Sequence, residues 1–335
     1  MYESFYNLSA KPFQLNPDPG FFFASKVHKR AMSYLEYGLH QGEGFIVITG
    51  EIGAGKTTLV RNLFRKVDTQ NMVAAQLVTT QLDADDTLRL IAAAFGLPHE
   101  NLSKAALLKK LEDFLHAVQH QGRRALLVVD EAQNLTPRAV EELRMLSNFQ
   151  SGEHSLLQSF LLGQPEFRKT LQGEDMRQLR QRIIASYHLG PMEASETRAY
   201  IEHRLHTVGW QADPTFSEDT FDAVHAYTGG IPRRINTLCD RVLLYGYLEE
   251  LHAIDAGIVN DVISDLQGEM TGPGAPVNGS HSRESGAELA PVDGISIAQL
   301  DNRVSKMEKS IRSILKLSRE ILASTSVKHQ EAEDK

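Results

Sequence analysis

GFIVITGEIGAGKTT, residues 44–58, is the stretch of sequence that decides the fold. Its first part, residues 44–49, is a nearly continuous apolar run, as expected for a strand that is covered on both faces. Residues 50–57 then match the pattern G-x-x-x-x-G-K-[ST], and residues 56–67 have the periodicity of a helix. A glycine-rich turn that merely joins a strand to a helix is the simpler reading. The full pattern in this context favours a phosphate-binding loop.

The residue types in this loop suit a nucleotide with its magnesium ion. Glycines let backbone N–H groups curl around phosphate oxygens, and the start of the helix adds partial positive charge. Lys56 can reach the β- and γ-phosphates, and the Thr57 hydroxyl can bind Mg²⁺. We therefore expect ATP and Mg²⁺ as ligands. The predicted binding residues are Gly50, Gly53, Ala54, Gly55, Lys56, Thr57 and, with a weaker argument, Thr58.

The rest of the body alternates between strands and helices up to residue 190. Further strands are predicted at residues 72–79, 125–130, 156–163 and 185–189, with helical patterns between them. Such alternation predicts an α/β sheet with helices on both faces. After Pro191 only helical periodicity is found, at residues 195–208, 217–227, 232–248 and 255–266. These predict a separate helical unit without strands.

Polar residues end two of the predicted strands. Asp130 and Glu131 follow the apolar run 125–129, where the carboxyl end of a parallel strand faces a ligand crevice. Asp130 is expected to hold Mg²⁺, and Glu131 to polarise an attacking water, which favours hydrolysis. Gln164 follows the next predicted strand and could position that water, although it could also simply begin a loop.

Four arginines are candidates for contact with the outer phosphates. Arg233 lies where a helix of the second unit begins and could act as a sensor of nucleotide state, or only cap a turn. Arg177, Arg180 and Arg182 precede the last strand. One of them could reach the γ-phosphate of a neighbouring subunit, and Arg182 is our choice because it directly precedes the strand. A solvated basic helix face is the competing interpretation of these three.

Composition narrows the class of protein. The chain has 335 residues, a formal net charge of −8 and one cysteine, Cys239, which excludes an internal disulfide and fits a reducing compartment. No signal peptide is visible in the first 20 residues, and no apolar run approaches the length that spans a bilayer. These features predict a cytoplasmic protein.

The last 68 residues differ from the body. Residues 268–294 are rich in Gly, Pro and Ser, a composition that predicts a flexible linker. We predict an amphipathic helix at residues 295–325 and a polar tail at residues 326–335. The helix has a short heptad seam and a basic face. It could form a coiled coil or dock on a partner, lie on an anionic membrane surface at the inner membrane, or pack back on the body.

Together these residues resemble an AAA+ ATPase. The strings that narrow the resemblance to the general secretion pathway protein A (ExeA-type) family are MYESFY at 1–6, PF at 12–13, PDP at 17–19, His28, YGL at 37–39, DEAQ at 130–133, GQPE at 163–166, QRI at 181–183 and GGIPR at 229–233. The chain is most similar to a short cytoplasmic form associated with exosortase (PEP-CTERM) and exopolysaccharide loci. It departs from the longer form, which continues into a membrane span and a peptidoglycan-binding region.

The resemblance implies an architecture and partners. It implies a P-loop AAA+ core with a five-stranded parallel sheet at residues 44–190, an α-helical lid at 191–267, and a C-terminal helix. Residues 1–43 would lie near the nucleotide base, where His28 could contact it or simply be packed or solvated. It also implies a homo-oligomer, ring-like in form, that completes the site between subunits.

Three functions remain at this stage. The first is an ATPase that powers or switches a cell-envelope secretion or exopolysaccharide export system. The second is a DNA-associated AAA+ ATPase of the transposition target-selection type. Residues 1–267 carry 26 basic and 33 acidic residues, so no stable DNA binding is expected. The third, a scaffold that binds nucleotide without hydrolysis, is disfavoured by Glu131.

Overall fold

The protein was analysed as a computed structural model that describes residues 1–16, 18–66, 70–78, 83–152 and 154–270. Two compact units divide the chain, Met1–Gln267 and Gly268–Lys335. The last helix described, α12 (Ala256–Met270), continues three residues into the predicted linker. The rest of that linker, the predicted helix 295–325 and the polar tail 326–335 lie outside the described residues.

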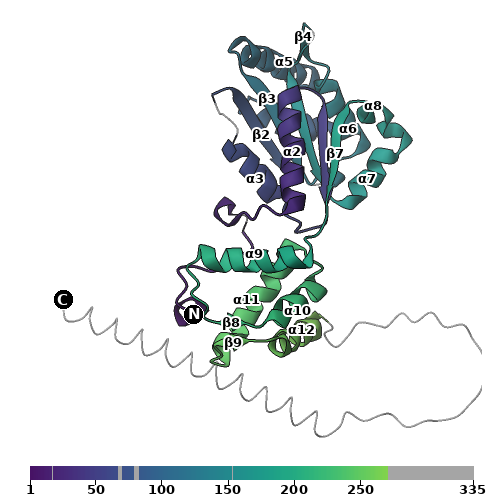
Figure 1. Cartoon of the computed structure of the whole chain (residues 1–335). Helices are drawn as coiled ribbons and strands as arrows, with labels where there is room; N and C mark the ends of the chain where they lie inside the picture. Colours follow the sequence, from purple (N-terminus) through teal and green to yellow (C-terminus); the bar gives the residue numbers. More distant parts are fainter. Residues whose placement is uncertain (17, 67–69, 79–82, 153, 271–335) are drawn as a thin grey trace, which may run out of the picture. The chain divides into compact units, whose positions relative to one another are not determined.

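A five-stranded parallel sheet forms the centre of the first unit (Figure 1). Its strands are β1 (Phe45–Gly50), β2 (Met72–Val78), β3 (Arg124–Asp130), β6 (Leu157–Gly163) and β7 (Ile183–Leu189). They lie in the order β2-β3-β6-β1-β7, and every neighbouring pair is parallel. The predicted α/β class and five-stranded sheet are therefore confirmed, with the strand before the glycine-rich loop between two neighbours.

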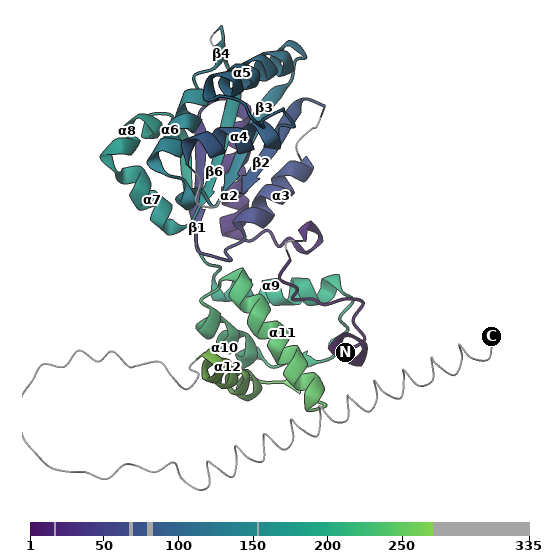
Figure 2. The same ribbon diagram turned by 180° about the vertical axis from the view of Figure 1, so that it is seen from behind.

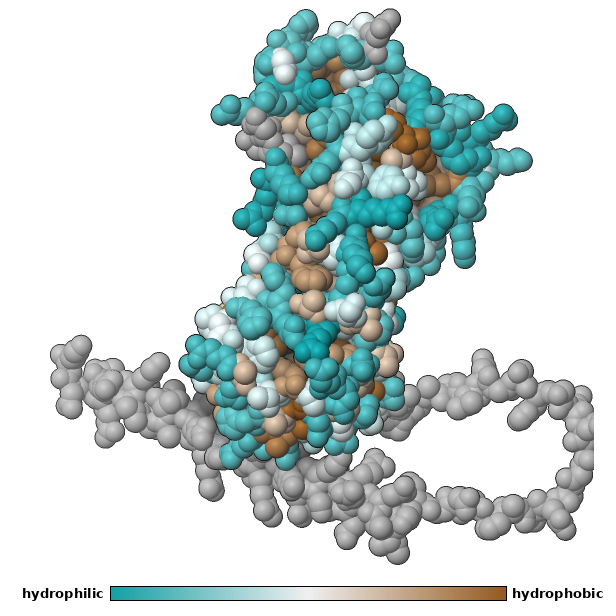
Figure 3. Space-filling model, in the orientation of Figure 1, coloured by the Kyte–Doolittle hydropathy of each residue, from teal (hydrophilic) through white to brown (hydrophobic). Residues whose placement is uncertain are grey.

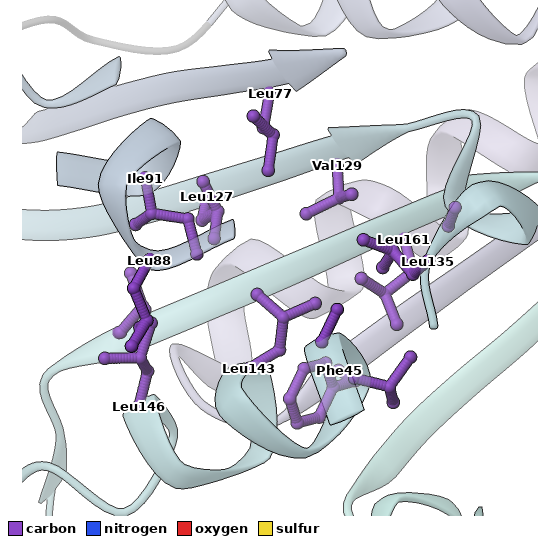
Figure 4. Close-up of a cluster of buried hydrophobic side chains, with 14 of the residues drawn as sticks. Phe45, Leu77, Leu88, Ile91, Leu127, Val129, Leu135, Leu143, Leu146 and Leu161 are labelled. Carbon is purple, nitrogen blue, oxygen red and sulfur yellow. The ribbon is translucent and has the colours of Figure 1, made fainter. Parts of the chain in front are cut away.

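Helices cover both faces of this sheet, so its three central strands β3, β6 and β1 are buried on both faces. Ile46 and Ile48 pack under the helices α2 (Lys26–Gln41) and α3 (Lys56–Lys66). Phe45 and Val47 point to the opposite face and join a second core, part of which Figure 4 shows. The helices that cover this second face, seen in Figure 2, are α4 (Ala84–Ala94), α5 (Lys104–His120), α6 (Pro137–Leu146), α7 (Pro165–Gln172) and α8 (Arg177–Arg180).

Local start signals explain several of these helices. The hydroxyl of Ser103 accepts a hydrogen bond from the Ala106 N–H at 3.3 Å, and Thr136 caps α6 in the same way ahead of Pro137. Helices α2, α4 and α7 were not predicted from the sequence, although Ser25 and Asp83 cap the first two by the same chemistry.

The helical unit that follows residue 190 consists of α9 (Ala194–Thr207), α10 (Glu218–Thr228), α11 (Pro232–Leu248) and α12. The expectation that strands stop after Pro191 was wrong in one detail. Two short strands, β8 (Thr215–Phe216) and β9 (Ala253–Ile254), pair in parallel and tie the chain before α10 to the chain before α12. Two-residue strands carry no periodicity that a sequence pattern could detect.

The start of the N-terminal segment packs mainly on this helical unit, whereas Phe22 packs against the sheet-side core that contains Ile46 and Ile48. Helix α1 (Tyr2–Phe5) and the 3₁₀ turn η1 (Pro19–Phe21) contribute to the same apolar core as α9–α12. The Tyr2 hydroxyl donates to Asp240 at 2.5 Å, and the Tyr6 hydroxyl donates to the Leu251 carbonyl at 2.9 Å. The predicted segment 1–43 is thus divided between the helical unit and, through α2, the sheet.

Short elements complete the described part of the chain. A small hairpin pairs β4 (Gln150–Ser151) with β5 (His154–Ser155), and 3₁₀ turns η2 (Ala132–Asn134) and η3 (Glu174–Met176) follow β3 and α7. In the view of Figure 3 the surface is mostly hydrophilic with scattered apolar residues. Among the described helices, none has the length and apolar character needed to cross a membrane.

Candidate functional site

The glycine-rich loop connects the carboxyl end of β1 to the start of α3. Gly53 and Gly55 have φ angles of +83° and +96°, which favour glycine. A Cβ atom at Gly53 would lie 2.3 Å from the Cβ of Arg233, and one at Gly55 would lie 2.8 Å from Nε2 of His28. A side chain at either position would displace a neighbour. The loop therefore has a backbone that only glycine adopts without strain or overlap at these two positions, which is the conformational freedom that a phosphate-binding cradle requires.

Lys56 is buried in this cradle, with a side chain whose ammonium group faces loop oxygens. Its Nζ donates to the carbonyls of Gly50 at 2.6 Å and Glu51 at 3.0 Å. Burial lowers the pKa of Lys56, while the nearby carboxylates of Glu131 and Asp130 oppose that shift. A buried ammonium that is held only by neutral carbonyls is a strong site for an anion.

Thr57 and Asp130 lie together at the start of α3 and the end of β3. The Thr57 hydroxyl donates to Oδ2 of Asp130 at 2.8 Å, and the backbone N–H of Glu131 donates to Oδ1 at 3.0 Å. Asp130 is only 3% exposed, and this burial raises the pKa of its carboxyl group despite the two hydrogen bonds. A hydroxyl beside a carboxylate is a set of hard oxygen donors that suits Mg²⁺.

Glu131 is held by two glutamines. Its Oε2 accepts from Nε2 of Gln133 at 2.6 Å and from Nε2 of Gln164 at 3.1 Å, and the backbone N–H of Gln164 donates to Oε1 of Gln133 at 3.0 Å. Burial raises the pKa of Glu131, but these hydrogen bonds and nearby Lys56 outweigh it, so the pKa is lower than usual. Glu131 is therefore ionised at neutral pH, as a carboxylate that accepts a proton must be.

The backbone of Glu131 is unusual as well. Its φ of 57° and ψ of 41° lie in the left-handed region, which non-glycine residues rarely adopt. The chain turns sharply here from β3 into η2, and this turn brings Gln133 back onto the glutamate side chain. Strained backbone of this kind is often found at functional sites.

A pocket of about 360 Å³ opens beside the loop. At one end it is lined by Gly53, Gly55 and Lys56, with Thr57, Thr58 and Glu131 beside them. Its other walls come from the N-terminal segment, including Leu15 and Phe21–Phe23, and from the helical unit, including Tyr200, Arg204 and Asn236. The pocket is therefore formed by three parts of the sequence around one phosphate-sized cradle.

His28 contacts the loop and not only the pocket. Its Nε2 donates to the Ala54 carbonyl at 3.0 Å, and its Nδ1 accepts from the Ser25 hydroxyl at 2.7 Å. Because a carbonyl only accepts, the proton of a neutral imidazole must be on Nε2. Burial lowers the pKa of His28, which keeps the ring neutral. His28 thus connects the start of α2 to the loop backbone.

The predicted arginines lie in different places. Arg233 is exposed, lines the pocket, and donates its backbone N–H to the Gly53 carbonyl at 3.2 Å. Arg182 lies outside this pocket, at the amino end of β7, where its guanidinium donates to the Ser147 hydroxyl at 2.8 Å. Arg180 donates to the carbonyls of Leu171 and Gly173 at the end of α7, and Arg177 is exposed on α8. None of these three lines the pocket beside the glycine-rich loop.

Several site residues had no predicted role. Gln133 stands two residues after Glu131 in a string that we quoted only for its resemblance. Tyr200 and Asn236 lie 36 positions apart on two helices and meet only in the folded chain. Phe21 and Leu15 lie in a segment without periodicity. The only sequence signal was the position of Asn236 three residues after Arg233, which places both on one face of a helix.

The fold is that of the P-loop AAA+ ATPases. Among solved structures, the chain is similar to the Aeropyrum pernix ORC2 protein in its ADPNP–ADP complexes, with a TM-score of 0.58 and 16% identity over 78% of this chain and 72% of that one. It is similarly close to Cdc6p from Pyrobaculum aerophilum, with a TM-score of 0.58 and 16% identity over 76% and 70% of the two chains. At this identity the likeness shows the fold alone.

The sequence comparisons are more specific. Residues 39–171 match the family described as AAA domain. The chain is 38% identical over 269 residues to General secretion pathway protein A of Aeromonas hydrophila. That match covers 80% of this chain and 49% of the relative, so the chain spans about half of the relative's length.

Proposed function

We propose that this chain is an AAA+ ATPase of the general secretion pathway protein A type, which binds ATP with Mg²⁺ and hydrolyses it. The observation that carries this proposal is the cluster at the carboxyl ends of β1, β3 and β6. There a buried lysine, a Thr57–Asp130 hydrogen bond of 2.8 Å and an ionised Glu131 meet beside one glycine cradle. Together they supply a cation, magnesium ligands and a base.

In the proposed site, Lys56 exchanges its loop carbonyls for the β- and γ-phosphate oxygens of ATP, which are stronger acceptors. Thr57 and Asp130 would hold Mg²⁺. When bound there, Mg²⁺ would neutralise charge that develops on the phosphates. The proposed roles of the other phosphate-binding residues, Gly50, Gly53, Ala54, Gly55 and Thr58, rest on their backbone N–H groups and on their position in or next to the loop.

Glu131 and Gln164 are proposed to act on the attacking water. The ionised Glu131 carboxylate accepts a hydrogen bond from that water and then its proton, which makes the oxygen a better nucleophile. Gln164 Nε2, now 3.1 Å from the same carboxylate, is close enough to hold the water and the glutamate in one arrangement. Arg233, at the start of α11, is proposed to report nucleotide state to the helical lid.

The cellular role is proposed from the relative. Its printed name, General secretion pathway protein A, supports an ATPase that powers or switches a cell-envelope secretion system. We extend this proposal to exopolysaccharide export and to a link with exosortase loci. The proposed setting is a homo-oligomer, ring-like in form, in the cytoplasm or at the inner membrane. Its proposed partners are export components, and residues 295–325 could contribute a membrane contact.

Equilibrium binding of ATP to two variants tests the proposed site. Lys56→Ala removes the charge that faces the phosphates, so we expect ATP affinity to fall by about a hundredfold or more with or without Mg²⁺. Thr57→Ala should lose only the strengthening of ATP binding that Mg²⁺ provides. Titration calorimetry with Mg²⁺ and with EDTA separates the two effects. Unchanged ATP affinity in Lys56→Ala would contradict the site.

A further inference from the structure

Three buried polar side chains line the pocket away from the loop. Tyr200 and Arg204 lie on α9, and Asn236 lies on α11. Arg204 and Asn236 are 6% and 7% exposed, and Tyr200 is 5% exposed. Nη1 of Arg204 lies 2.9 Å from the Tyr200 hydroxyl oxygen, and that oxygen lies 2.8 Å from Oδ1 of Asn236. Charged and amide groups are costly to bury, so a chain of three of them indicates a specific task.

The chemistry of the groups fixes the direction of this hydrogen-bond chain. A guanidinium only donates, so the tyrosine oxygen accepts from Arg204. The single phenolic proton is then given to Asn236, which must accept with Oδ1. Burial raises the pKa of Tyr200, so the proton stays on the phenol at neutral pH. With Oδ1 engaged, Asn236 is oriented so that its Nδ2 amide is the remaining hydrogen-bonding group.

Within the described residues, no group accepts a hydrogen bond from this Nδ2. Arg204 itself is fixed by further bonds, from Nε to the Pro12 carbonyl at 2.6 Å and from Nη2 to the Gln14 carbonyl at 3.3 Å. Its guanidinium also stacks on the Phe21 ring at 4.8 Å. The side chains that orient this donor are therefore fixed, and Asn236 lines the pocket.

Helix α11 sets the distance of this donor from the phosphate cradle. The backbone N–H of Arg233 bonds to Gly53 in the loop, and Asn236 is three residues further along the same face. At a rise of about 1.5 Å per residue, it lies about 4.5 Å further along the helix axis. The donor is thus beyond the cradle, in the part of the pocket that the N-terminal segment encloses.

Two apolar side chains of the same pocket are left open to solvent. Leu15 and Ile52 are 56% and 58% exposed, and both line the pocket together with Phe21–Phe23. Large exposed apolar groups around a buried polar donor suit a flat ligand with apolar faces and a polar edge. A purine base has this character, since its faces stack and its ring nitrogens accept hydrogen bonds.

We propose that the Arg204–Tyr200–Asn236 chain reads the base of the bound nucleotide, by presenting Asn236 Nδ2 as a donor to an unprotonated ring nitrogen of a purine. The proposal rests on the proposed function, because it assumes that phosphates occupy the cradle. Asn236 is then a specificity residue, and Tyr200 and Arg204 are positioning residues that hold its amide in one orientation.

Binding of ATP analogues to the full chain tests this reading. In 1-deaza-, 3-deaza- and 7-deaza-ATP one ring nitrogen is replaced by carbon, so one analogue should lack the acceptor. That analogue should bind the unmodified protein about five- to tenfold more weakly than ATP, the value of one hydrogen bond. In Asn236→Ala, ATP should weaken by the same factor, and that analogue should then bind no more weakly than ATP. The loss of affinity caused by the analogue and the loss caused by Asn236→Ala should therefore not add.

Two further variants make the test specific. Tyr200→Phe keeps the ring but frees the amide, so ATP should weaken less than in Asn236→Ala and the analogue should lose most of its disadvantage. Thr237→Ala is the control, because its hydroxyl bonds to the Arg233 carbonyl at 3.0 Å and does not line the pocket. It should bind all four nucleotides like the unmodified protein.

Two outcomes separate the two proposals. If the unmodified protein binds ATP but none of the three deaza analogues is weaker, or if the losses in Asn236→Ala simply add, base reading by this chain of residues is wrong. The first of these two results is obtained with the unmodified protein alone, so it does not depend on whether a variant folds. If the unmodified protein binds neither ATP nor any analogue, the proposed function itself fails.

Discussion

Single residues outside the glycine-rich loop hold it in shape. His28 is the clearest case, because its ring bridges the Ser25 hydroxyl and the Ala54 carbonyl, and its burial favours the neutral form of the ring. Protonation would turn Nδ1 from an acceptor into a donor and break the bond from Ser25 as now directed. Because a charged ring is costly to bury, the stability of this arrangement is linked to the protonation of His28, which lies 26 positions from Ala54 in sequence.

This linkage predicts a pH dependence. The pKa of His28 is lowered by burial from an ordinary value near 6.5, so below that pH the unfolded chain binds a proton that the folded chain does not. Stability contributed by neutral His28 is therefore present above pH 6.5 and decreases as the pH falls below it. His28→Gln keeps a donor but does not titrate. The difference in free energy of unfolding between the unmodified protein and His28→Gln should therefore shrink by up to about 1.4 kcal/mol when the pH falls from 7.5 to 5.5.

Urea midpoints at the two pH values measure this difference. His40→Gln is a suitable control, since His40 lies in the last turn of α2, remote from the loop at the start of that helix. A difference between the protein and His28→Gln that is the same at both pH values would contradict a neutral, loop-bound His28.

Motif spacing allowed part of this site to be predicted. Lys56, Thr57, Asp130, Glu131 and Gln164 follow strands that proved to be neighbours or near neighbours, so the sheet order brings them together. The roles of Gln133 and His28 could not be predicted in the same way. Their contacts depend on a left-handed backbone turn and on a helix that carries no motif. Such contacts are decided by tertiary geometry, which one sequence does not reveal.

At the scale of elements, the junction between the sheet and the helical unit of α9–α12 depends on a glycine. Met192, just before α9, donates its backbone N–H to the Gly230 carbonyl at 3.0 Å, immediately ahead of α11. A Cβ at Gly230 would lie 2.1 Å from the Met192 carbonyl oxygen. Backbone meets backbone here, so neither side can move away as a flexible side chain could. The starts of α9 and α11 are therefore held in close contact.

Two adjacent glycines allow a matched test of this junction. Gly229 and Gly230 have φ angles of +61° and +70°, but a Cβ at Gly229 meets nothing within 4 Å. Gly229→Ala should cost only the left-handed penalty of about 1 kcal/mol. Gly230→Ala should cost about 3 kcal/mol because overlap adds to strain. Chemical denaturation measures both, and equal losses would show that the contact with Met192 contributes nothing.

The element scale also shows what sequence patterns miss. The strands β1 and β3 were predicted because buried parallel strands are nearly continuous apolar runs, and the four helices after residue 190 because of their helical periodicity. Helix α7 has eight residues and the β8–β9 pair only two residues a strand, too few for a pattern to establish itself. The packing of α1 and η1 on the helical unit of α9–α12 is a long-range contact that no local pattern encodes.

Whole-molecule geometry bears on Arg182. It precedes β7, whereas the glycine-rich loop follows the neighbouring parallel strand β1, so the two lie at opposite edges of the sheet. Seven strand residues at about 3.3 Å each separate these edges by about 20 Å. An arginine cannot cover that distance. Any contact of Arg182 with a γ-phosphate must therefore be made with the site of another subunit.

Mixing of inactive subunits tests this contact. Arg182→Ala keeps its own loop, and Lys56→Ala keeps its own Arg182, so a mixed interface should contain one complete site. We expect ATP turnover per subunit of the unmodified protein to rise with protein concentration. We expect the mixture of the two variants to recover activity that neither has alone. If turnover is independent of concentration and mixing recovers no activity, Arg182 does not contact the site of another subunit. Its bond to Ser147 would then be a structural contact.

The central claim is that Glu131 activates water for hydrolysis, and Glu131→Gln tests it most directly. The amide has nearly the same shape but cannot accept a proton, so ATP affinity should stay within about threefold while phosphate release falls by a factor of about a hundred or more. The measurement is single-turnover phosphate release at saturating ATP and Mg²⁺, beside a binding titration of the same variant. Loss of release with binding retained is the result that this account predicts. Release at the unmodified rate by Glu131→Gln would contradict it.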